Sequence, residues 1–213
     1  MSVEKIMPKD GPSIYEVEKY IKKYSNELIV IKAGGSVLLD KNLFKQFIED
    51  ISVIYKLGLS VIVVHGGGKN IKKKLDVLNI ESKFIDGLRV TDEKIIKVVE
   101  EALLELNSEI INSLEKLQTN IQSVTPKNEN IINIIPEKKE LGFVGIPKEI
   151  NKEVLLNIVQ QRKIPIIVPM GIGEDRNIYN INADVAAGAI AKEFGSRRLL
   201  LMTDVEGVLD KEK

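Results

Sequence analysis

Two apolar segments rich in β-branched residues place the strongest constraint on this chain. They are "ELIVIK" (27–32) and "LSVIVVH" (59–65), and neither alternates apolar with polar residues. Unbroken runs of this kind are typical of strands buried on both faces of a parallel sheet. Each run leads into glycines, "AGG" at 33–35 and "GGG" at 66–68. The sequence therefore predicts a buried parallel sheet in which two strands end without side chains.

Helical patterns alternate with these strands. Between the two segments, apolar side chains recur three and four residues apart, and Gly58 follows as the glycine that ends a helix. Thr91 or Asp92 is expected to cap a later helix. Alternating strands and helices predict a three-layer α/β/α sandwich with a mainly parallel, open central sheet. Further elements are expected as helices at 92–117, 151–161 and 184–194 and strands at 164–171 and 198–204.

The middle of the chain has a different pattern. The segments 121–124, 130–135 and 141–146 have the composition of short strands joined by turns with proline and asparagine. This pattern predicts an antiparallel patch. Residues 13–24 form an amphipathic helix ahead of the first strand. It either packs on its own domain or docks as an arm on a neighbouring subunit, and the sequence favours neither alternative.

Composition excludes several kinds of site. The 213 residues include no cysteine and one histidine, which excludes disulfides, thiol nucleophiles, cysteine zinc sites and multi-histidine metal sites. Lys plus Arg and Asp plus Glu both number 31. This balance is unlike the basic excess of proteins that bind nucleic acids or membrane surfaces. No apolar run has the length of a transmembrane helix and the N-terminus lacks a signal-peptide core, so a cytoplasmic protein is expected.

The glycines after the two strands predict an anion site. Ligands of parallel sheets bind beyond the carboxyl ends of the strands. Glycine there lets backbone N–H groups approach an oxyanion, and a following helix adds a partial positive charge. Neither turn has the spacing of a P-loop or of G-x-G-x-x-G. Two such turns follow neighbouring strands, and one of them comes just after the positively charged Lys32. This combination favours an anion site over a purely steric use of glycine.

Three polar positions allow alternative interpretations. His65 is more simply a residue packed at the turn than a general base, because no acidic partner or nucleophile stands beside it. The lysines at 72–74 are typical of a solvated helix face. Arg89, in "DGLRVTD", either binds a carboxylate through its bidentate guanidinium or forms a surface ion pair with Asp86 or Asp92.

The segment "YNINADVAAGAIA" (179–191) leads from an extended stretch into an alanine-rich helix. Asn180, Asn182 and Asp184 alternate and therefore share one face of the extended stretch. Asp184 is an ordinary N-cap on one interpretation and orients a lysine of the site on the other. Asn180 is a candidate for holding an amide or a carboxylate.

Six segments in a fixed order carry a family resemblance: "VIKAGGS", "VVHGGGKNI", "FIDGLRVTD", "LGFVGI", "GEDRNIYNINADVAAGAIA" and "LLLMTDVEGVLD". Over residues 14–210 the chain resembles the acetylglutamate kinases of the amino-acid-kinase family. The resemblance implies the amino-acid-kinase fold and an enzyme of arginine biosynthesis, in which ATP phosphorylates the side-chain carboxylate of N-acetyl-L-glutamate. It also implies phosphate-bound Mg²⁺ without a protein ligand, inhibition by arginine, and a homo-oligomer that is a dimer or, through the N-terminal helix, a hexamer.

The same resemblance assigns roles to individual residues. Lys32 would stabilise the transferring phosphoryl group, and Asp184 would orient Lys32. The substrate-binding residues would be Gly67, Gly68, Arg89 and Asn180. The phosphate and nucleotide would contact Gly34, Gly35, Asp204, Val205, Glu206, Gly207, Val208 and Leu209.

The chain departs from the family pattern in three places. It stops at Lys213, where the family continues into a nucleotide lobe with a second catalytic lysine, so a truncated or fragmentary chain is expected. The segment 124–130 lacks a glycine and an aspartate of the family turn, and 103–109 lacks a glycine. The expected division is an arm helix at 1–24, a substrate-binding lobe at 25–196 and the start of the nucleotide-binding lobe at 197–213.

Two other functions stay open on the sequence alone. The chain could be a non-catalytic acetylglutamate-binding or regulatory module without ATP chemistry, although the presence of both Lys32 and Asp184 favours the kinase. It could also be a sister kinase that acts on aminoadipate or glutamate attached to a carrier protein. The segments "GLRVTD" and "NINAD" do not separate this activity from acetylglutamate kinase.

Overall fold

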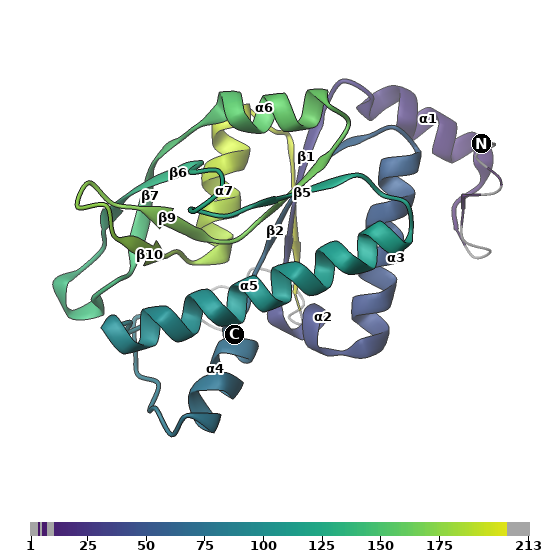
Figure 1. Ribbon diagram of the computed structural model, residues 1–213. Helices are drawn as coiled ribbons and strands as arrows, with labels where there is room; N and C mark the ends of the chain where they lie inside the picture. The colour runs from purple at the N-terminus through teal and green to yellow at the C-terminus, as the bar shows by residue number, and fades with distance from the viewer. Residues whose placement is uncertain (1–3, 5, 8–10, 204–213) are drawn as a thin grey trace, which may run out of the picture.

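A five-stranded parallel sheet forms the centre of the protein (Figure 1), in the order β11-β1-β2-β8-β5. This order and these parallel pairings confirm the predicted, mainly parallel central sheet. The computed structural model describes residue 4, residues 6–7 and residues 11–203. The strands of the sheet are β1 (Leu28–Ala33), β2 (Ser60–His65), β5 (Ile121–Val124), β8 (Ile164–Ile167) and β11 (Arg198–Met202).

The helices begin and end at residues that explain their boundaries. Asp92, rather than Thr91, is the N-cap of α5, where its Oδ1 accepts hydrogen bonds from two backbone N–H groups at 2.9 Å. Gly58 takes φ = +85° just after α3, as expected of the glycine that ends a helix. The helices are α1 (Ile14–Tyr24), α2 (Gly35–Leu39), α3 (Lys41–Lys56), α4 (Gly68–Val77), α5 (Glu93–Lys116), α6 (Lys152–Gln160) and α7 (Ala183–Phe194).

Helices cover both faces of the sheet. Ile29 and Ile31 of β1 pack in one apolar core with α3 and α5, whereas Val30 packs in another with α6 and α7. Successive side chains of a strand point to opposite faces, so one apolar run supplies both cores. This arrangement confirms the predicted three-layer sandwich.

A second sheet extends from the first, and three predictions in this part of the chain are wrong. Its strands lie in the order β10 (Ile178–Asn180), β9 (Met170–Ile172), β6 (Ile132–Pro136) and β7 (Gly145–Ile150). Residues 121–124 do not join it, because they form β5 and pair in parallel with β8. The strand expected at 141–146 is displaced by a 3₁₀ turn, η2 (Lys139–Leu141). The strand expected at 164–171 splits before Pro169, which has no N–H for a ladder.

The two internal segments that depart from the family pattern keep regular structure. The turn at 124–130 closes through Asn128, whose side chain accepts a hydrogen bond from the N–H of Thr125 (2.7 Å) and donates one to the carbonyl of Ser123 (2.8 Å). Residues 103–109 lie within the unbroken helix α5. Neither departure interrupts the sheet or the helix layer beside it.

A two-stranded hairpin carries Arg89. Its strands are β3 (Phe84–Ile85) and β4 (Leu88–Arg89), and the two turn residues, Asp86 and Gly87, have φ values of +50° and +78°. Positive φ at both positions is the geometry of a type I′ turn, which Asp-Gly favours. The tip of the hairpin is held by an ion pair of 2.7 Å between Asp86 and Lys138.

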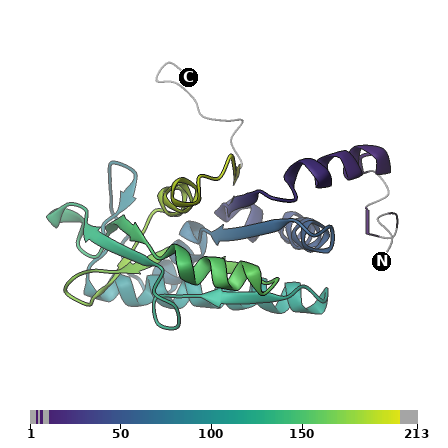
Figure 2. The same ribbon diagram turned by 90° about the horizontal axis from the view of Figure 1, so that it is seen from above.

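Helix α1 lies at the periphery of the molecule in both views (Figures 1 and 2). Val17 is its one buried residue, while Tyr15 and Tyr20 are 77% and 47% exposed. The guanidinium of Arg198 lies 4.9 Å from the ring of Tyr24 and links the end of α1 to β11. Most of the apolar face of α1 is therefore not covered by the described part of the chain. Within that part, no helix combines the length and the apolar character needed to cross a membrane.

Candidate active site

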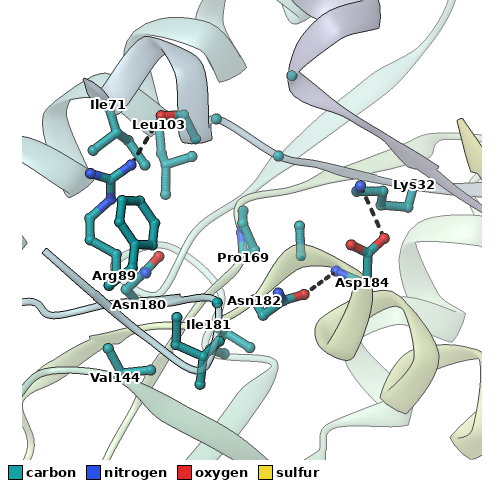
Figure 3. Close-up of a pocket in the computed structure, with 18 residues that line it drawn as sticks. Lys32, Ile71, Arg89, Leu103, Val144, Pro169, Asn180, Ile181, Asn182 and Asp184 are labelled. Atoms are coloured by element: carbon teal, nitrogen blue, oxygen red, sulfur yellow. Dashed lines mark hydrogen bonds and ion pairs between the residues drawn. The ribbon is translucent and has the colours of Figure 1, made fainter. Parts of the chain in front are cut away.

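The two glycine turns lie side by side, as the parallel strands predict. Ala33 at the end of β1 pairs with His65 at the end of β2, and the N–H of Gly66 donates to the carbonyl of Ala33 at 2.8 Å. Gly35 and the run 66–68 line one cavity of about 260 Å³ (Figure 3). The end of the sheet thus forms a pocket to which both glycine turns contribute.

Helix α4 begins at this pocket. Gly67 is its N-cap, and a Cβ atom at that position would lie 2.5 Å from the side chain of Leu103, so a larger residue would require either the turn or Leu103 to shift. The first intrahelical donor is the N–H of Ile71, which binds the carbonyl of Gly67 at 2.8 Å. The N–H groups of Gly67 and Gly68 precede it and lie at the positive end of the helix dipole. These two residues therefore offer an anion-binding edge to the pocket.

Lys32 and Asp184 form an ion pair at one end of the pocket (Figure 3). Their Nζ and Oδ1 atoms are 3.0 Å apart, and the side chains are 12% and 49% exposed. Asn182 is the N-cap of α7, where its Oδ1 accepts hydrogen bonds from the N–H groups of Asp184 (2.8 Å) and Val185 (3.2 Å). The interpretation of Asp184 as the N-cap is therefore wrong, and its carboxylate is turned to Lys32 instead.

Arg89 lies at the other end of the pocket and is only 7% exposed (Figure 3). Its Nη2 donates to the carbonyl of Gly68 at 3.1 Å, and its Nη1 donates to the hydroxyl of Ser82. The ring of Phe84 lies 4.8 Å from the guanidinium carbon. Two of the five N–H donors of the guanidinium are thus used by neutral groups, and three are left for a ligand.

The alternative of a surface ion pair for Arg89 is wrong. Asp86 binds Lys138, and Asp92 caps α5. Among residues 11–203, no carboxylate lies within ion-pair distance of Arg89, although the negative charge of Asp76 is close enough to favour the cation. Burial lowers the pKa of Arg89, but an arginine still carries its charge at neutral pH. A buried cation held by neutral groups favours an anionic ligand.

His65 is fully buried, as the simpler interpretation predicts. Its Nδ1 lies 3.2 Å from the carbonyl of Gly66, and its Nε2 lies 3.2 Å from the side-chain nitrogen of Asn107. Burial lowers its pKa to about 4. Both ring nitrogens are engaged inside the protein, so this histidine has no free nitrogen with which to act as a general base.

Acid is expected to destabilise the fold through His65. Its pKa is about 4 in the folded protein against 6.5 for an unperturbed histidine, so between these values only the unfolded chain binds the proton. The contribution of neutral His65 to the free energy of unfolding is fully present above the pKa of the unfolded state. It is lost as the pH falls toward the pKa of the folded state, by up to about 3 kcal/mol. In urea unfolding measured across this pH range, the free energy of unfolding should fall less with acid for His65→Asn than for the unmodified protein. An equal dependence on pH in the two proteins would contradict the assignment of this loss to His65.

The expectation of a solvated lysine face holds for two of its three members. Lys72 and Lys73 are exposed, but Lys74 binds Glu101 (2.9 Å) and Glu105 (2.8 Å) of α5. Lys74 therefore ties α4 to α5 behind the pocket.

The pocket brings together most of the residues expected from the sequence. Gly34 is not among its lining residues, and its N–H donates to the carbonyl of Met202 at 2.9 Å. Asp204, Val205, Glu206, Gly207, Val208 and Leu209 lie outside the described residues. The expected residues that line the pocket are Lys32, Gly35, Gly67, Gly68, Arg89, Asn180 and Asp184.

The pocket also contains residues that the sequence did not single out. Phe84 lies against Arg89, and Ile71, Leu103 and Pro169 add apolar wall. Within residues 11–203, no cluster of three or more His, Cys, Asp or Glu side chains could hold a metal ion. The pocket thus has Arg89 at one end, the Lys32–Asp184 ion pair at the other, and apolar or amide side chains between them.

The sequence model of the amino acid kinase family matches residues 27–213. The chain belongs to this family. It is 53% identical over 208 residues to the acetylglutamate kinase of Pelagibacter ubique (strain HTCC1062). The aligned region covers 98% of this chain and 72% of that protein. It is 40% identical over 205 residues to the acetylglutamate kinase of Petrotoga mobilis (strain DSM 10674 / SJ95), covering 94% and 68%.

Two solved structures have a similar fold. The smu.665 protein of Streptococcus mutans UA159 has a TM-score of 0.78 and 31% identity, over 86% of this chain and 75% of that one. The N-acetylglutamate synthase of Neisseria gonorrhoeae, complexed with coenzyme A and N-acetyl-glutamate, has a TM-score of 0.81, over 94% and 48%, but only 17% identity, which shows the fold alone. For an amino acid kinase, ATP is the expected phosphoryl donor.

Proposed function

We propose that this chain binds N-acetyl-L-glutamate and takes part in its phosphorylation by ATP in arginine biosynthesis. The product is N-acetyl-L-glutamyl 5-phosphate. The observation that carries the proposal is the pocket with the buried guanidinium of Arg89 at one end and the ammonium of Lys32, paired with Asp184, at the other, because acetylglutamate has a carboxylate at each end. The 53% identity to a protein named acetylglutamate kinase supports the same substrate.

The chemistry requires no general base. A side-chain carboxylate with a pKa of about 4.3 is already ionised at neutral pH. One of its oxygens attacks the γ-phosphorus of ATP, the bond between that phosphorus and the bridging oxygen breaks, and ADP leaves with the electron pair. The two reactants are both anions, so the protein's task is to position them and to neutralise their charge. A pocket without histidine or cysteine is suited to this task.

The proposed roles follow the positions of the side chains. Arg89 binds the α-carboxylate through two of its three remaining donors, and Asn180 holds the amide part of the acetylglutamate. The N–H groups of Gly67 and Gly68 receive the reacting carboxylate. The family resemblance assigns the phosphate and nucleotide to Gly34, Gly35 and 204–209, and Mg²⁺ is proposed to bind through the phosphates.

Lys32 is proposed to stabilise the transferring phosphoryl group. Its ammonium has three donors, and one is directed to Asp184 at 3.0 Å, so two are left for phosphoryl oxygens. Asp184 keeps the ammonium at the mouth of the pocket and is therefore proposed as an orienting residue.

Calorimetry combined with product trapping tests the proposed function. The chain is titrated with acetylglutamate, with glutamate as the matched ligand without the acetyl group, and with ATP; acyl phosphate is trapped as its hydroxamate. Preferential binding of acetylglutamate and ATP-dependent hydroxamate would support the kinase. Acetylglutamate binding without ATP binding would favour the binding module instead, and no binding of acetylglutamate would refute the substrate.

We further propose that 1–24 is an arm, 25–196 a substrate lobe and 197–213 the beginning of a nucleotide lobe. The exposed apolar residues of α1, Ile14, Tyr15 and Tyr20, support an arm that joins copies of the chain into a homo-oligomer and that carries inhibition by arginine. Deletion of 1–24 is expected to lower the number of chains per oligomer measured by light scattering and to remove the arginine effect. An unchanged number of chains would refute the arm.

A further inference from the structure

His65 and Asn107 form a buried polar pair directly beneath the glycine turn. They are 0% and 2% exposed, and the proposed chemistry uses neither side chain. They come from β2 and from the middle of α5, and the His65 Nε2 and Asn107 Nδ2 atoms are 3.2 Å apart. A polar pair in an apolar layer is costly unless its groups are hydrogen-bonded. Such a pair therefore requires an explanation beyond packing.

The hydrogen bonds of Asn107 determine which nitrogen of His65 carries the proton. The Oδ1 of Asn107 accepts a bond from the hydroxyl of Ser123 at 2.6 Å, and its Nδ2 donates to the carbonyl of Ile166 at 3.2 Å. The same Nδ2 has a second hydrogen, which faces His65. Nε2 of His65 must then be an acceptor, so in the neutral ring Nδ1 carries the hydrogen and donates it to the carbonyl of Gly66. A pKa of about 4 keeps the ring neutral at physiological pH.

The orientation of this carbonyl determines the direction of a donor in the pocket. A trans peptide is planar, and its C=O and N–H point in opposite directions. The carbonyl of Gly66 is turned inward to His65, so the N–H of Gly67, in the same peptide, is turned the other way. The N–H of Gly66 is itself held by the carbonyl of Ala33 at 2.8 Å. The peptide planes on both sides of Gly66 are thus held by hydrogen bonds.

We propose that His65 and Asn107 are positioning residues that hold the peptide between Gly66 and Gly67 with its N–H directed at the substrate's reacting carboxylate. If this peptide turned over, the carbonyl oxygen of Gly66 would face an anion and repel it. The identity of the anion rests on the proposed function, but the orientation of the peptide does not. The pair therefore acts on the substrate through the backbone and touches it nowhere.

Substitution of His65 separates positioning from packing. His65→Leu removes both ring nitrogens, whereas His65→Asn keeps a side-chain N–H near the position of Nδ1. His65→Leu is expected to weaken acetylglutamate binding by about ten-fold or more, with ATP affinity within about two-fold, and His65→Asn is expected to recover most of the loss. Unchanged affinity in His65→Leu, or equal losses for both ligands, would overturn the proposal.

A second buried polar pair supplies the matched control. Thr119 donates to Ser52 at 3.0 Å, and both residues are 2% exposed. Thr119 follows the C-terminal end of α5, and Ser52 lies in α3. The double variant Thr119→Val with Ser52→Ala removes a buried hydrogen bond without touching the glycine turn. Acetylglutamate affinity is expected to stay the same. An equal loss in this variant would show that the effect of His65→Leu is general destabilisation and would overturn the proposal.

Nuclear magnetic resonance tests the inference independently of the substrate. In the unmodified protein the ¹⁵N shifts of His65 are expected to show the hydrogen on Nδ1, and the amide of Gly67 is expected to shift in His65→Leu and in Asn107→Leu. A hydrogen on Nε2, or an unshifted Gly67 amide, would overturn the inference. If His65→Leu does not fold, the Gly67 amide shift in Asn107→Leu and the ring tautomer of His65 test the inference instead. If the unmodified chain does not bind acetylglutamate, the proposed function is refuted, while these spectra still test whether His65 and Asn107 orient the peptide.

Discussion

Lys32→Ala is expected to lower turnover by about a thousand-fold, while the affinity for acetylglutamate stays within about two-fold. The ammonium of Lys32 is proposed to act where phosphoryl charge develops, whereas Arg89 and backbone donors are proposed to hold acetylglutamate. Asp184 is 49% exposed, so water can solvate it after the substitution, and the fold should not suffer greatly. Turnover is measured by hydroxamate trapping and affinity by calorimetry.

Lys32→Arg and Asp184→Asn are the controls for this result. Arginine keeps the positive charge but not the compact ammonium, so it is expected to recover part of the rate. Asp184→Asn keeps the size of the side chain and removes the charge that orients Lys32, so it is expected to reduce the rate by less than Lys32→Ala does. Unchanged turnover in Lys32→Ala would remove this lysine from the mechanism.

Arg89→Lys is expected to weaken acetylglutamate binding by about a hundred-fold and to leave ATP binding within about two-fold. A lysine cannot keep the contacts of the guanidinium with Ser82, Gly68 and Phe84 and also present two parallel donors to a carboxylate. The measurement is calorimetry with each ligand separately. Equal losses for both ligands would contradict a carboxylate clamp at Arg89.

Lys138→Ala is the matched control for Arg89. It removes an ion pair at the tip of the same hairpin, with Asp86 at 2.7 Å, and both side chains are exposed. Exposed pairs contribute at most about 1 kcal/mol, so acetylglutamate affinity should change little. A loss as large as that of Arg89→Lys would mean that the hairpin as a whole, rather than its guanidinium, controls binding.

The sequence predicted the sheet and the glycine-lined pocket because both follow from short-range patterns. Unbroken apolar runs indicate parallel strands, and the carboxyl ends of such strands meet at one edge of the sheet. Gly67, Gly68 and Lys32 could therefore be expected in one place, whereas the family resemblance was what joined Asp184 to Lys32. The parallel order of the strands and the residues that line the pocket agree with that expectation.

Errors arose where two residues are equally suited to one position or where the partner is distant in sequence. Asn182 and Asp184 are both good helix caps, and only the backbone geometry shows that Asn182 has this role. The strand at 121–124 resembles its antiparallel neighbours, because an edge strand is only partly buried. The contact between His65 and Asn107 joins residues that are 42 positions apart, so no local sequence pattern predicts it.

One contact could have been found from the sequence. The Asp-Gly pair at 86–87 predicts a two-residue hairpin, in which Phe84 and Arg89 are directly opposite each other, as they are in the structure. Aromatic rings across a strand pair from a cation commonly lie against it. The aromatic partner of Arg89 was thus implied by the turn residues.

The hydrogen bond from Gly66 to the carbonyl of Ala33 joins the turn proposed for the substrate to the turn after the strand of Lys32. The two turns consequently share one rigid backbone contact, and a ligand that orders either of them lowers the entropy that the other must lose. Such linkage is reciprocal, so phosphoryl acceptor and donor should each raise the affinity for the other by the same factor. We therefore expect cooperativity between the two reactants from the pairing of β1 with β2.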